Sequence, residues 1–275
     1  MGQAIGRLLY ENNQPVVCVA GRTLERARAA AIFIGSDVEA VSLAELPERT
    51  PRVLICVPDS ALDSLARGLE LRAGIALHTC GARGADALEP LAGHGVSCGA
   101  IHPLQTITDP LTGARVLRGA AFAISGDGPA LAWAEQIVHA AHGRALRIAD
   151  SERPLYHAAA VMASNYLVAL MAAAEELMGV AGIAPADARY ALAPLASASL
   201  ENTLRAGPAA ALTGPIERGD ASTVAAHLEA LSAASDTVKR LYVAAGLQTL
   251  VLARKRGLPE ERAAGIERLL REKMN

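Results

Sequence analysis

Residues 1–27 read MGQAIGRLLYENNQPVVCVAGRTLERA, and the order of the elements in this stretch decides the fold. An apolar helix pattern starts directly at Met1, and a β-branched strand over 14–21 follows it. In a dinucleotide-binding fold a first strand leads into a G-x-G-x-x-G turn, which opens the first helix. Gly2 stands where the third glycine of that turn is expected. The sequence therefore predicts that the first strand and the first two glycines are missing from these 275 residues.

Two explanations fit this opening. The start may have been assigned at an internal Met just before the third glycine, which is the explanation we favour. Alternatively, the chain is truly short, its sheet lacks a central strand, and cofactor binding is impaired. About ten codons upstream of Met1 that spell an apolar strand followed by G-x-G would decide between them.

The end of the strand over 14–21 predicts which nicotinamide cofactor binds. An acidic residue normally stands there and holds the ribose hydroxyls of NAD. Here Arg22 and Thr23 replace the acid. A cation and a hydroxyl suit a 2′-phosphate, so the sequence predicts NADP, with its pyrophosphate resting on the helix that begins near Gly2.

The rest of the first half alternates strands with helices. Near-continuous apolar runs alternate with helical patterns, which indicates a parallel sheet covered by helices on both faces. We therefore predict a doubly wound α/β domain over residues 1–150. Its further strands are expected at 52–59, 74–81, 96–104, 120–128 and 145–150.

The pattern changes near Asp150, because no strand signal follows it. Helical patterns are interrupted by a Gly- and Pro-containing loop over 210–220. Aromatic residues make up only 3% of the chain, so Ala, Val, Leu and Ile fill the core, which favours close-packed helices. The sequence predicts an all-α bundle domain over residues 151–275. Its helices are expected at 151–179, 184–207, 221–235, 236–257 and 259–273.

Charge and composition exclude several classes of protein. The net charge is −2 and no stretch forms a basic face, so nucleic acid is not an expected partner. The apolar run over 157–177 contains Ser164, Asn165 and Glu175, and it is interpreted as a buried bundle helix rather than a membrane span. No signal peptide is visible, and the four cysteines lack zinc-like spacing. A cytoplasmic protein with reduced cysteines and without a metal site is expected.

Three stretches carry a more specific resemblance. They are HTCGARGADALEPLAGHGVSCGAIHPLQTITDP (78–110), YHAAAVMASNYLVALMAAAEEL (156–177) and ALTGPIERGDASTVAAHLEAL (211–231). Together they resemble Rossmann-like proteins with a DUF2520 domain, in the 6-phosphogluconate dehydrogenase C-terminal-like superfamily, whose relatives include ketopantoate and pyrroline-5-carboxylate reductases. The resemblance implies an NADP-dependent reductase that forms a homodimer through its helical domain and binds a small substrate in a cleft between domains.

Hydride transfer needs a proton donor or a hydrogen-bond donor beside the reacting carbonyl or imine. His102 and Gln105 follow an apolar strand, where ligands gather in parallel sheets, although a structural His-Pro turn explains His102 equally well. His157 and Asn165 share one helical stripe. Related 2-keto-acid reductases often have Lys-x-x-x-Asn on this helix. Asn165 matches the Asn of this motif, but Val161 occupies the Lys position. His157, one turn earlier, is the candidate that replaces the lysine as proton donor, and the alternative is a histidine that caps the helix or packs in the core.

Two further groups of residues are candidates for binding. In pyrroline-5-carboxylate reductases a Gly/Thr-rich loop contacts the substrate carboxylate. The resemblance implies this role for Thr213, Gly214, Arg218 and Thr223, with an Asp220–Arg218 cap as the alternative. At strand ends that should border the cofactor, the candidates are Val57, Pro58, His78, Thr79 and Gly81.

The predicted function is NADPH-dependent reduction of a small carboxylated keto compound, with ketopantoate as the leading substrate. Imine reduction of the pyrroline-5-carboxylate type is the neighbouring chemistry. A non-catalytic, dimeric nucleotide-binding protein is a third alternative, because the glycine-rich turn and the lysine are both missing.

Overall fold

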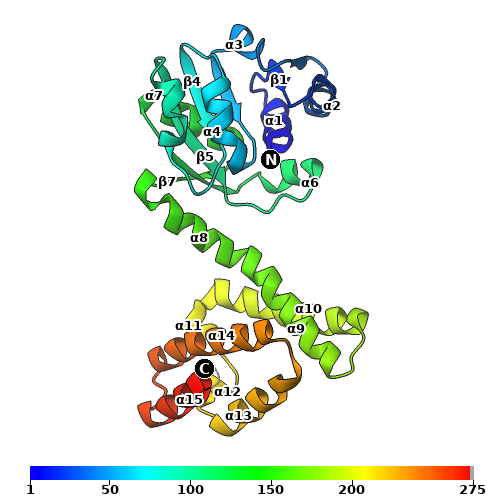
Figure 1. Ribbon diagram of the computed structural model, residues 1–275, viewed down its shortest axis with the longest axis vertical. Coiled ribbons are helices and arrows are strands. Elements are labelled where there is room, and N and C mark those ends of the chain that lie inside the picture. The colour runs from blue at the N-terminus through cyan, green and yellow to red at the C-terminus, as the bar shows by residue number, and fades with distance from the viewer. Residues whose placement is uncertain (273–275) are drawn as a thin grey trace. The chain divides into compact units, whose positions relative to one another are not determined.

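The computed structural model describes residues 1–272, and it forms two compact units, Met1–Ser164 and Asn165–Asn275 (Figure 1). The final residue of the last predicted helix, 273, lies outside the described residues. The sequence places the join near residue 150. In the structure, the helix that follows residue 152 therefore belongs to the first unit rather than to the second.

The first unit alternates strands and helices. Its strands are β1 (Cys18–Ala20), β2 (Glu39–Val41), β3 (Arg52–Ile55), β4 (Gly74–His78), β5 (Val96–Pro103), β6 (Ala121–Gly126) and β7 (Arg144–Arg147). Its helices are α1 (Gly2–Glu11), α2 (Leu24–Ile34), α3 (Leu46–Arg49), α4 (Asp59–Gly68), α5 (Glu89–Ala92), α6 (Pro110–Val116), α7 (Gly128–Ala140) and α8 (Arg153–Ala163). The sequence analysis did not predict β2, α3 or α6, which are all short.

The strands form two sheets instead of one. β1 pairs with β2, and a separate sheet has the order β3-β4-β5-β6-β7. The doubly wound order is 3-2-1-4-5-6, with the first strand preceding the first helix. Applied here, this order reads β2-β1, then a strand that would precede α1, then β3-β4-β5. Within the described residues, β1 and β3 each pair with another strand on one side only.

The larger sheet is dominated by parallel pairs, as predicted, but it contains one antiparallel pair. β3, β4 and β5 are parallel, but β6 runs antiparallel to β5, with Ile101 paired with Ile124. β7 returns parallel to β6. The only helix between β5 and β6 is the seven-residue α6, and this connection brings the chain back antiparallel instead of crossing the sheet.

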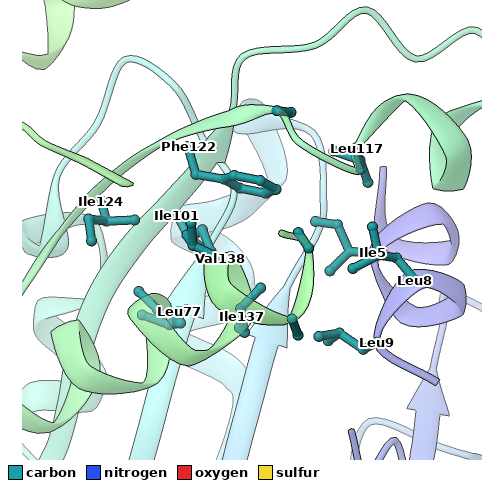
Figure 2. Close-up of a cluster of buried hydrophobic side chains, with 14 of the residues drawn as sticks. Ile5, Leu8, Leu9, Leu77, Ile101, Leu117, Phe122, Ile124, Ile137 and Val138 are labelled. Carbon is teal, nitrogen blue, oxygen red and sulfur yellow. The ribbon is translucent and has the colours of Figure 1, made fainter. Parts of the chain in front are cut away.

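Both faces of the larger sheet are covered. Leu77 and Ile101 point into a cluster with Ile5 and Leu8 of α1 and Ile137 of α7, as Figure 2 shows. The neighbouring strand residues Ala76 and Cys98 pack on the opposite face with the α4 and α5 helices. Because successive side chains of a strand point to opposite faces, these two clusters place the sheet between helical layers.

The second unit is entirely helical in its described part. Its helices are α9 (Asn165–Val180), α10 (Pro185–Ala206), α11 (Pro208–Ala211), α12 (Pro215–Arg218), α13 (Ala221–Ala230), α14 (Asp236–Lys255) and α15 (Glu260–Glu272). Its core lies among α12 to α15, around Val224, Leu250 and Ile266. Pro194 lies inside α10, and short helices α11 and α12 occupy part of the predicted loop over 210–220.

The prediction of a buried helix over 157–177 is wrong for this chain. By length and composition alone, the stretch Asp150–Val180 is apolar and long enough to cross a membrane. No residue in its most apolar segment of 18 residues is buried. α9 has no buried residue, and α10 buries only Ala188. Several large apolar side chains of these helices are exposed, whereas Ala173 and Leu177 of α9 pack against the core of the second unit.

Candidate functional site

The N-terminus of α1 lies against the end of β3. A Cβ atom added at Gly2 would come within 2.8 Å of the Cβ of Cys56, so only glycine permits this approach. This is the packing role of the third glycine in a dinucleotide-binding turn. No side chain caps α1, and the first intrahelical bond is donated by Ile5, so the N–H groups of Gly2, Gln3 and Ala4 are free of helical partners.

Arg22 and Thr23 lie directly after β1. Arg22 is exposed and makes no ion pair within residues 1–272. Thr23 caps α2, because its hydroxyl accepts a hydrogen bond from the backbone N–H of Arg26 at 3.3 Å. The guanidinium is therefore available to an anionic ligand at the start of α2.

The ends of β3 and β4 hold the other residues predicted to border the cofactor. Val57 packs against the core and Pro58 precedes α4 at the surface. The backbone N–H of Thr79 bonds to the carbonyl of Ile55, which ties the two strand ends together. Gly81 is buried and lies directly beneath two histidine rings, as described below.

His78 has a structural role that conflicts with cofactor binding by its ring. It is fully buried, and its Nδ1 accepts a hydrogen bond from the backbone N–H of Cys80 at 3.2 Å. Its Nε2 then donates to the carbonyl of Gly84 at 2.7 Å. Burial lowers the pKa of His78, which is consistent with a neutral ring. Both ring nitrogens are used within the turn, so the prediction for this side chain is corrected.

Three side chains converge above Gly81. His102 lies near the end of β5, and Tyr156 lies on α8. The Nδ1 of His102 and the hydroxyl of Tyr156 are 2.8 Å apart and share a hydrogen bond, whose donor depends on the tautomer of His102. The rings of His102 and His157 meet edge to face, with centroids 5.7 Å apart. A Cβ added at Gly81 would lie 3.0 Å from the Nε2 of each histidine, so both Nε2 atoms face this glycine.

The Nε2 of His102 and both nitrogens of His157 have no hydrogen-bond partner in the described part of the chain. Every fully buried side-chain nitrogen or oxygen in that part does have a partner. These three nitrogens are therefore not fully buried and keep some contact with solvent.

The protonation of His102 and Tyr156 follows from their burial. Burial lowers the pKa of His102 to about 4, helped by the neighbouring His157 and Arg153 and opposed by Asp59. Burial likewise raises the pKa of Tyr156 to about 12, and Arg153 opposes this shift. At neutral pH, His102 is therefore a neutral imidazole and Tyr156 a neutral phenol.

Arg153 anchors the helix that carries Tyr156 and His157. Its side chain is completely buried, and its Nε donates to the hydroxyl of Ser125 at 3.0 Å. Its guanidinium also donates to three backbone carbonyl groups. They belong to Ala100 in β5, Ala123 in β6 and Cys80 just after β4. A buried charge is tolerated only when it is well bonded, so this set of acceptors fixes the start of α8 against the strand ends.

Gln105 is not part of this cluster. Its side-chain amide donates to the carbonyl of Val116 at 3.2 Å, and its carbonyl oxygen accepts from the N–H of Thr106. The hydroxyl of Thr106 lies 3.0 Å from that of Ser164 at the end of α8. The contact of Gln105 with substrate stays a prediction, and in this structure its side chain stabilises the loop before α6.

Asn165 differs from its prediction in two respects. The helix predicted as continuous is interrupted at Ser164, so His157 lies in α8 and Asn165 begins α9 of the second unit. Asn165 is also exposed, which removes the argument that a buried amide needs partners. Its catalytic role stays a prediction.

The loop before α13 contains the remaining candidates. Thr213 and Arg218 are exposed, and Gly214 has φ of 104°, a backbone conformation that favours glycine. Thr223 donates through both its N–H and its hydroxyl to Asp220, at 3.0 and 2.6 Å. Asp220 therefore caps α13 with Thr223 rather than through an ion pair with Arg218, and these bonds lower the pKa of its carboxyl to about 2. The hydroxyl of Thr223 is committed to this cap.

Comparison with protein families accounts for most of the chain. Residues 1–103 match the Rossmann-like domain, and residues 120–249 match the family described as domain of unknown function DUF2520. The chain therefore combines a Rossmann-like domain with a DUF2520 domain. The position of Gly2 at the start of α1 and the exposed Arg22 belong to the Rossmann-like part, and α8 with His157 belongs to the DUF2520 part.

Solved structures share this fold at low sequence identity. Protein TM1727 from Thermotoga maritima matches with a TM-score of 0.73 and 23% identity, over 92% of this chain and 96% of that chain. BF3122 from Bacteroides fragilis, described as a candidate NADP oxidoreductase, matches with a TM-score of 0.65 and 23% identity over 92% of both chains. A reductive aminase from Aspergillus terreus, in complex with NADPH and ethyl-5-oxohexanoate, matches with a TM-score of 0.61 and 17% identity, over 100% of this chain and 90% of that one. Comparison with curated protein sequences finds no match.

Sequence reasoning missed two members of the cluster in this DUF2520 chain. Tyr156 directly precedes His157, and Arg153 is a lone cation in the first turn of an otherwise apolar helix. A charged residue followed by a hydroxyl-bearing ring on one side of such a helix is a usable signal. It carries no information, however, about which strand end the helix meets.

Proposed function

We propose that the protein is an NADPH-dependent oxidoreductase that reduces a small carbonyl compound bearing a carboxylate, with ketopantoate as the leading substrate. The observation that carries this proposal is the convergence of His102 and His157 on Gly81 at the strand ends. Two reachable imidazoles at this edge of a Rossmann-like sheet are suited to bind and protonate a reacting oxygen.

The residues at this edge fit the cofactor. The uncapped N-terminus of α1, brought close to the strand end by Gly2, suits the pyrophosphate. Arg22 suits the 2′-phosphate, and the backbone at Val57, Pro58, Thr79 and Gly81 borders the same edge. Bound NADPH supplies the hydride.

The chain itself has to bind the substrate and supply a proton. His157 has two nitrogens free of protein partners, so it is the proposed proton donor. His102 stays neutral because burial depresses its pKa. Separately, Thr213, Gly214 and Arg218, which lie on one loop of the second unit, are proposed to bind a carboxylate, and Asn165 and Gln105 are proposed as polar contacts within their own units. Thr223 would support that loop through its cap.

Loss of NADPH absorbance on mixing with ketopantoate tests this function directly. Turnover of ketopantoate supports the keto-acid proposal. Turnover of a cyclic imine alone supports the alternative of imine reduction, which the shared fold of the reductive aminase favours. Tight NADPH binding in calorimetry without turnover of either substrate favours a non-catalytic protein, an alternative that Val161 in the lysine position supports.

Replacing Arg22 by Ala is expected to raise the Kd for NADPH about tenfold, because one charge-assisted bond to the 2′-phosphate contributes about 1.5 kcal/mol or more. The Kd for NADH should not change, since NADH lacks that phosphate. Calorimetric titration with both cofactors measures this. Arg28→Ala is the matched control, because Arg28 is also an exposed arginine and lies nearby on α2. An equal loss for NADH would argue against recognition of the 2′-phosphate by Arg22.

We further propose that α9 and α10 form the interface of a homodimer. Their large apolar side chains are exposed in the single chain, among them Tyr166, Val168, Tyr190, Leu195 and Leu204. A surface of this kind on a soluble protein marks an interaction site. Polar groups interrupt it, including the Glu175–Arg189 ion pair, which suits a protein partner better than lipid. A second copy provides a self-complementary surface.

Replacing Tyr190 by Glu should shift the protein from dimer to monomer at micromolar concentration, because the pair of new charges would be buried at the interface. Sedimentation equilibrium measures the shift. Ile32→Glu is the control, since Ile32 is an equally exposed apolar residue on α2, 81% exposed against 86% for Tyr190. A wild-type protein that is monomeric and binds lipid vesicles would contradict the proposal.

A further inference from the structure

The hydrogen bond between His102 and Tyr156 can be formed in two ways. Either the Tyr156 hydroxyl donates to Nδ1 and the proton of His102 lies on Nε2, or Nδ1 carries the proton and donates to the hydroxyl oxygen. Both residues are neutral near pH 7, so charge does not separate these arrangements. They differ in what His102 presents beside Gly81: an N–H donor in the first, a bare acceptor in the second.

Two observations favour donation by Tyr156. The hydroxyl has no second partner within residues 1–272, so in the other arrangement its proton would have no acceptor there. Arg153 carries a positive charge close to both rings and favours the orientation in which the phenol oxygen faces the cation and its proton faces His102. His78 already shows the same tautomer in this chain, because its Nδ1 accepts from Cys80 and its Nε2 donates to Gly84.

We propose that Tyr156 is a positioning residue that holds His102 as the Nε2–H tautomer, so that His102 offers a neutral hydrogen-bond donor to the reacting atom of the substrate. The inference rests on the proposed oxidoreductase function and deepens it. It divides the work between the two histidines: His102 binds the oxygen, and His157 supplies the proton.

This arrangement selects a class of substrate. A carbonyl oxygen accepts a hydrogen bond from Nε2–H, and the bond strengthens as negative charge develops on that oxygen during hydride transfer. A protonated imine carries its own N–H donor, so it would place donor against donor. The site in the first unit therefore favours a carbonyl compound over an iminium ion.

The environment of His102 keeps this donor neutral over the useful pH range. The groups that face it are Tyr156, His157 and Arg153 from α8 and Asp59 from the start of α4. Burial, His157 and Arg153 disfavour its imidazolium form, and Asp59 alone opposes them. With its pKa lowered to about 4, His102 is almost entirely neutral between pH 6 and 8.

Nitrogen NMR of the imidazole rings tests the proposal on the protein without substrate or cofactor. Long-range proton–nitrogen spectra, assigned with a His102→Gln variant, are expected to show a protonated Nε2, a bare Nδ1 and no titration between pH 6 and 8. In Tyr156→Phe the Nδ1 shift is expected to move, and both neutral tautomers should become visible. An Nδ1–H signal or an imidazolium at pH 7 in the wild type would overturn the proposal.

Tyr242→Phe is the matched control. It removes the hydroxyl that lies 2.9 Å from Nδ1 of His227 in the second unit, and it should leave the His102 signals unchanged. Unchanged His102 nitrogen shifts in Tyr156→Phe would equally overturn the proposal. Because the spectra need no turnover, failure of the proposed reaction would be recognised separately, as an absence of activity with the predicted tautomer still present.

Discussion

Replacing His157 by Ala is expected to lower kcat for carbonyl reduction by on the order of 10²–10⁴, the range for loss of a general acid. His157 has two nitrogens without protein partners, and His102 beside it is held neutral by burial. Tyr156, which bonds to His102, is a weaker candidate for the proton donor, because burial raises its pKa to about 12.

Steady-state kinetics with saturating NADPH measures this loss. His94→Ala, an exposed histidine at the end of α5, is the control and should retain wild-type kcat. NADPH affinity should be unchanged in both variants, which separates loss of the proton from loss of the fold. A decrease in kcat below about threefold would remove His157 from the role of general acid.

Joining an apolar strand and a G-x-G turn to Met1 is expected to tighten NADPH binding at least about tenfold and to raise the Tm by about 5 °C or more. β1 and β3 each have one unpaired edge, and Val17 just before β1 is 49% exposed. A strand between them would pair both edges, bury this apolar surface and lead a glycine turn onto α1 at Gly2.

Calorimetric titration with NADPH and thermal unfolding of both proteins measure the two effects. An extension of equal length made of Gly and Ser is the control, because it adds chain without strand propensity. If the apolar extension binds NADPH no better and unfolds at the same temperature as this control, the space between β1 and β3 is not a strand site.

The predicted alternation of strands and helices agrees with the first unit, because the apolar pattern of each element is local. The pattern failed where direction matters. β6 has a buried apolar sequence, and this local pattern does not show that the strand runs antiparallel to β5. The apolar pattern also failed to predict the exposure of α9. Such a pattern predicts a buried helix, but it does not show whether the same chain or a partner covers that helix.

The candidate site was predicted in part. Position after a strand indicated His102, and Gly2 and Arg22 followed from their register with a nucleotide-binding turn. His78 was predicted by the same rule, but its two ring nitrogens are used within a turn, and chain position alone does not show this.

The sequence by itself determined that an α/β half precedes a helical half, that Gly2 stands at the start of an apolar helix, and that a cation replaces the usual acid after β1. These features depend on residues close together in the chain. Only the tertiary structure decided that Tyr156 meets His102, 54 positions away, and that Arg153 joins α8 to carbonyl groups within β5 and β6 and just after β4. The physical reason is that such contacts depend on where a helix docks, and docking is set by the packing of the whole unit.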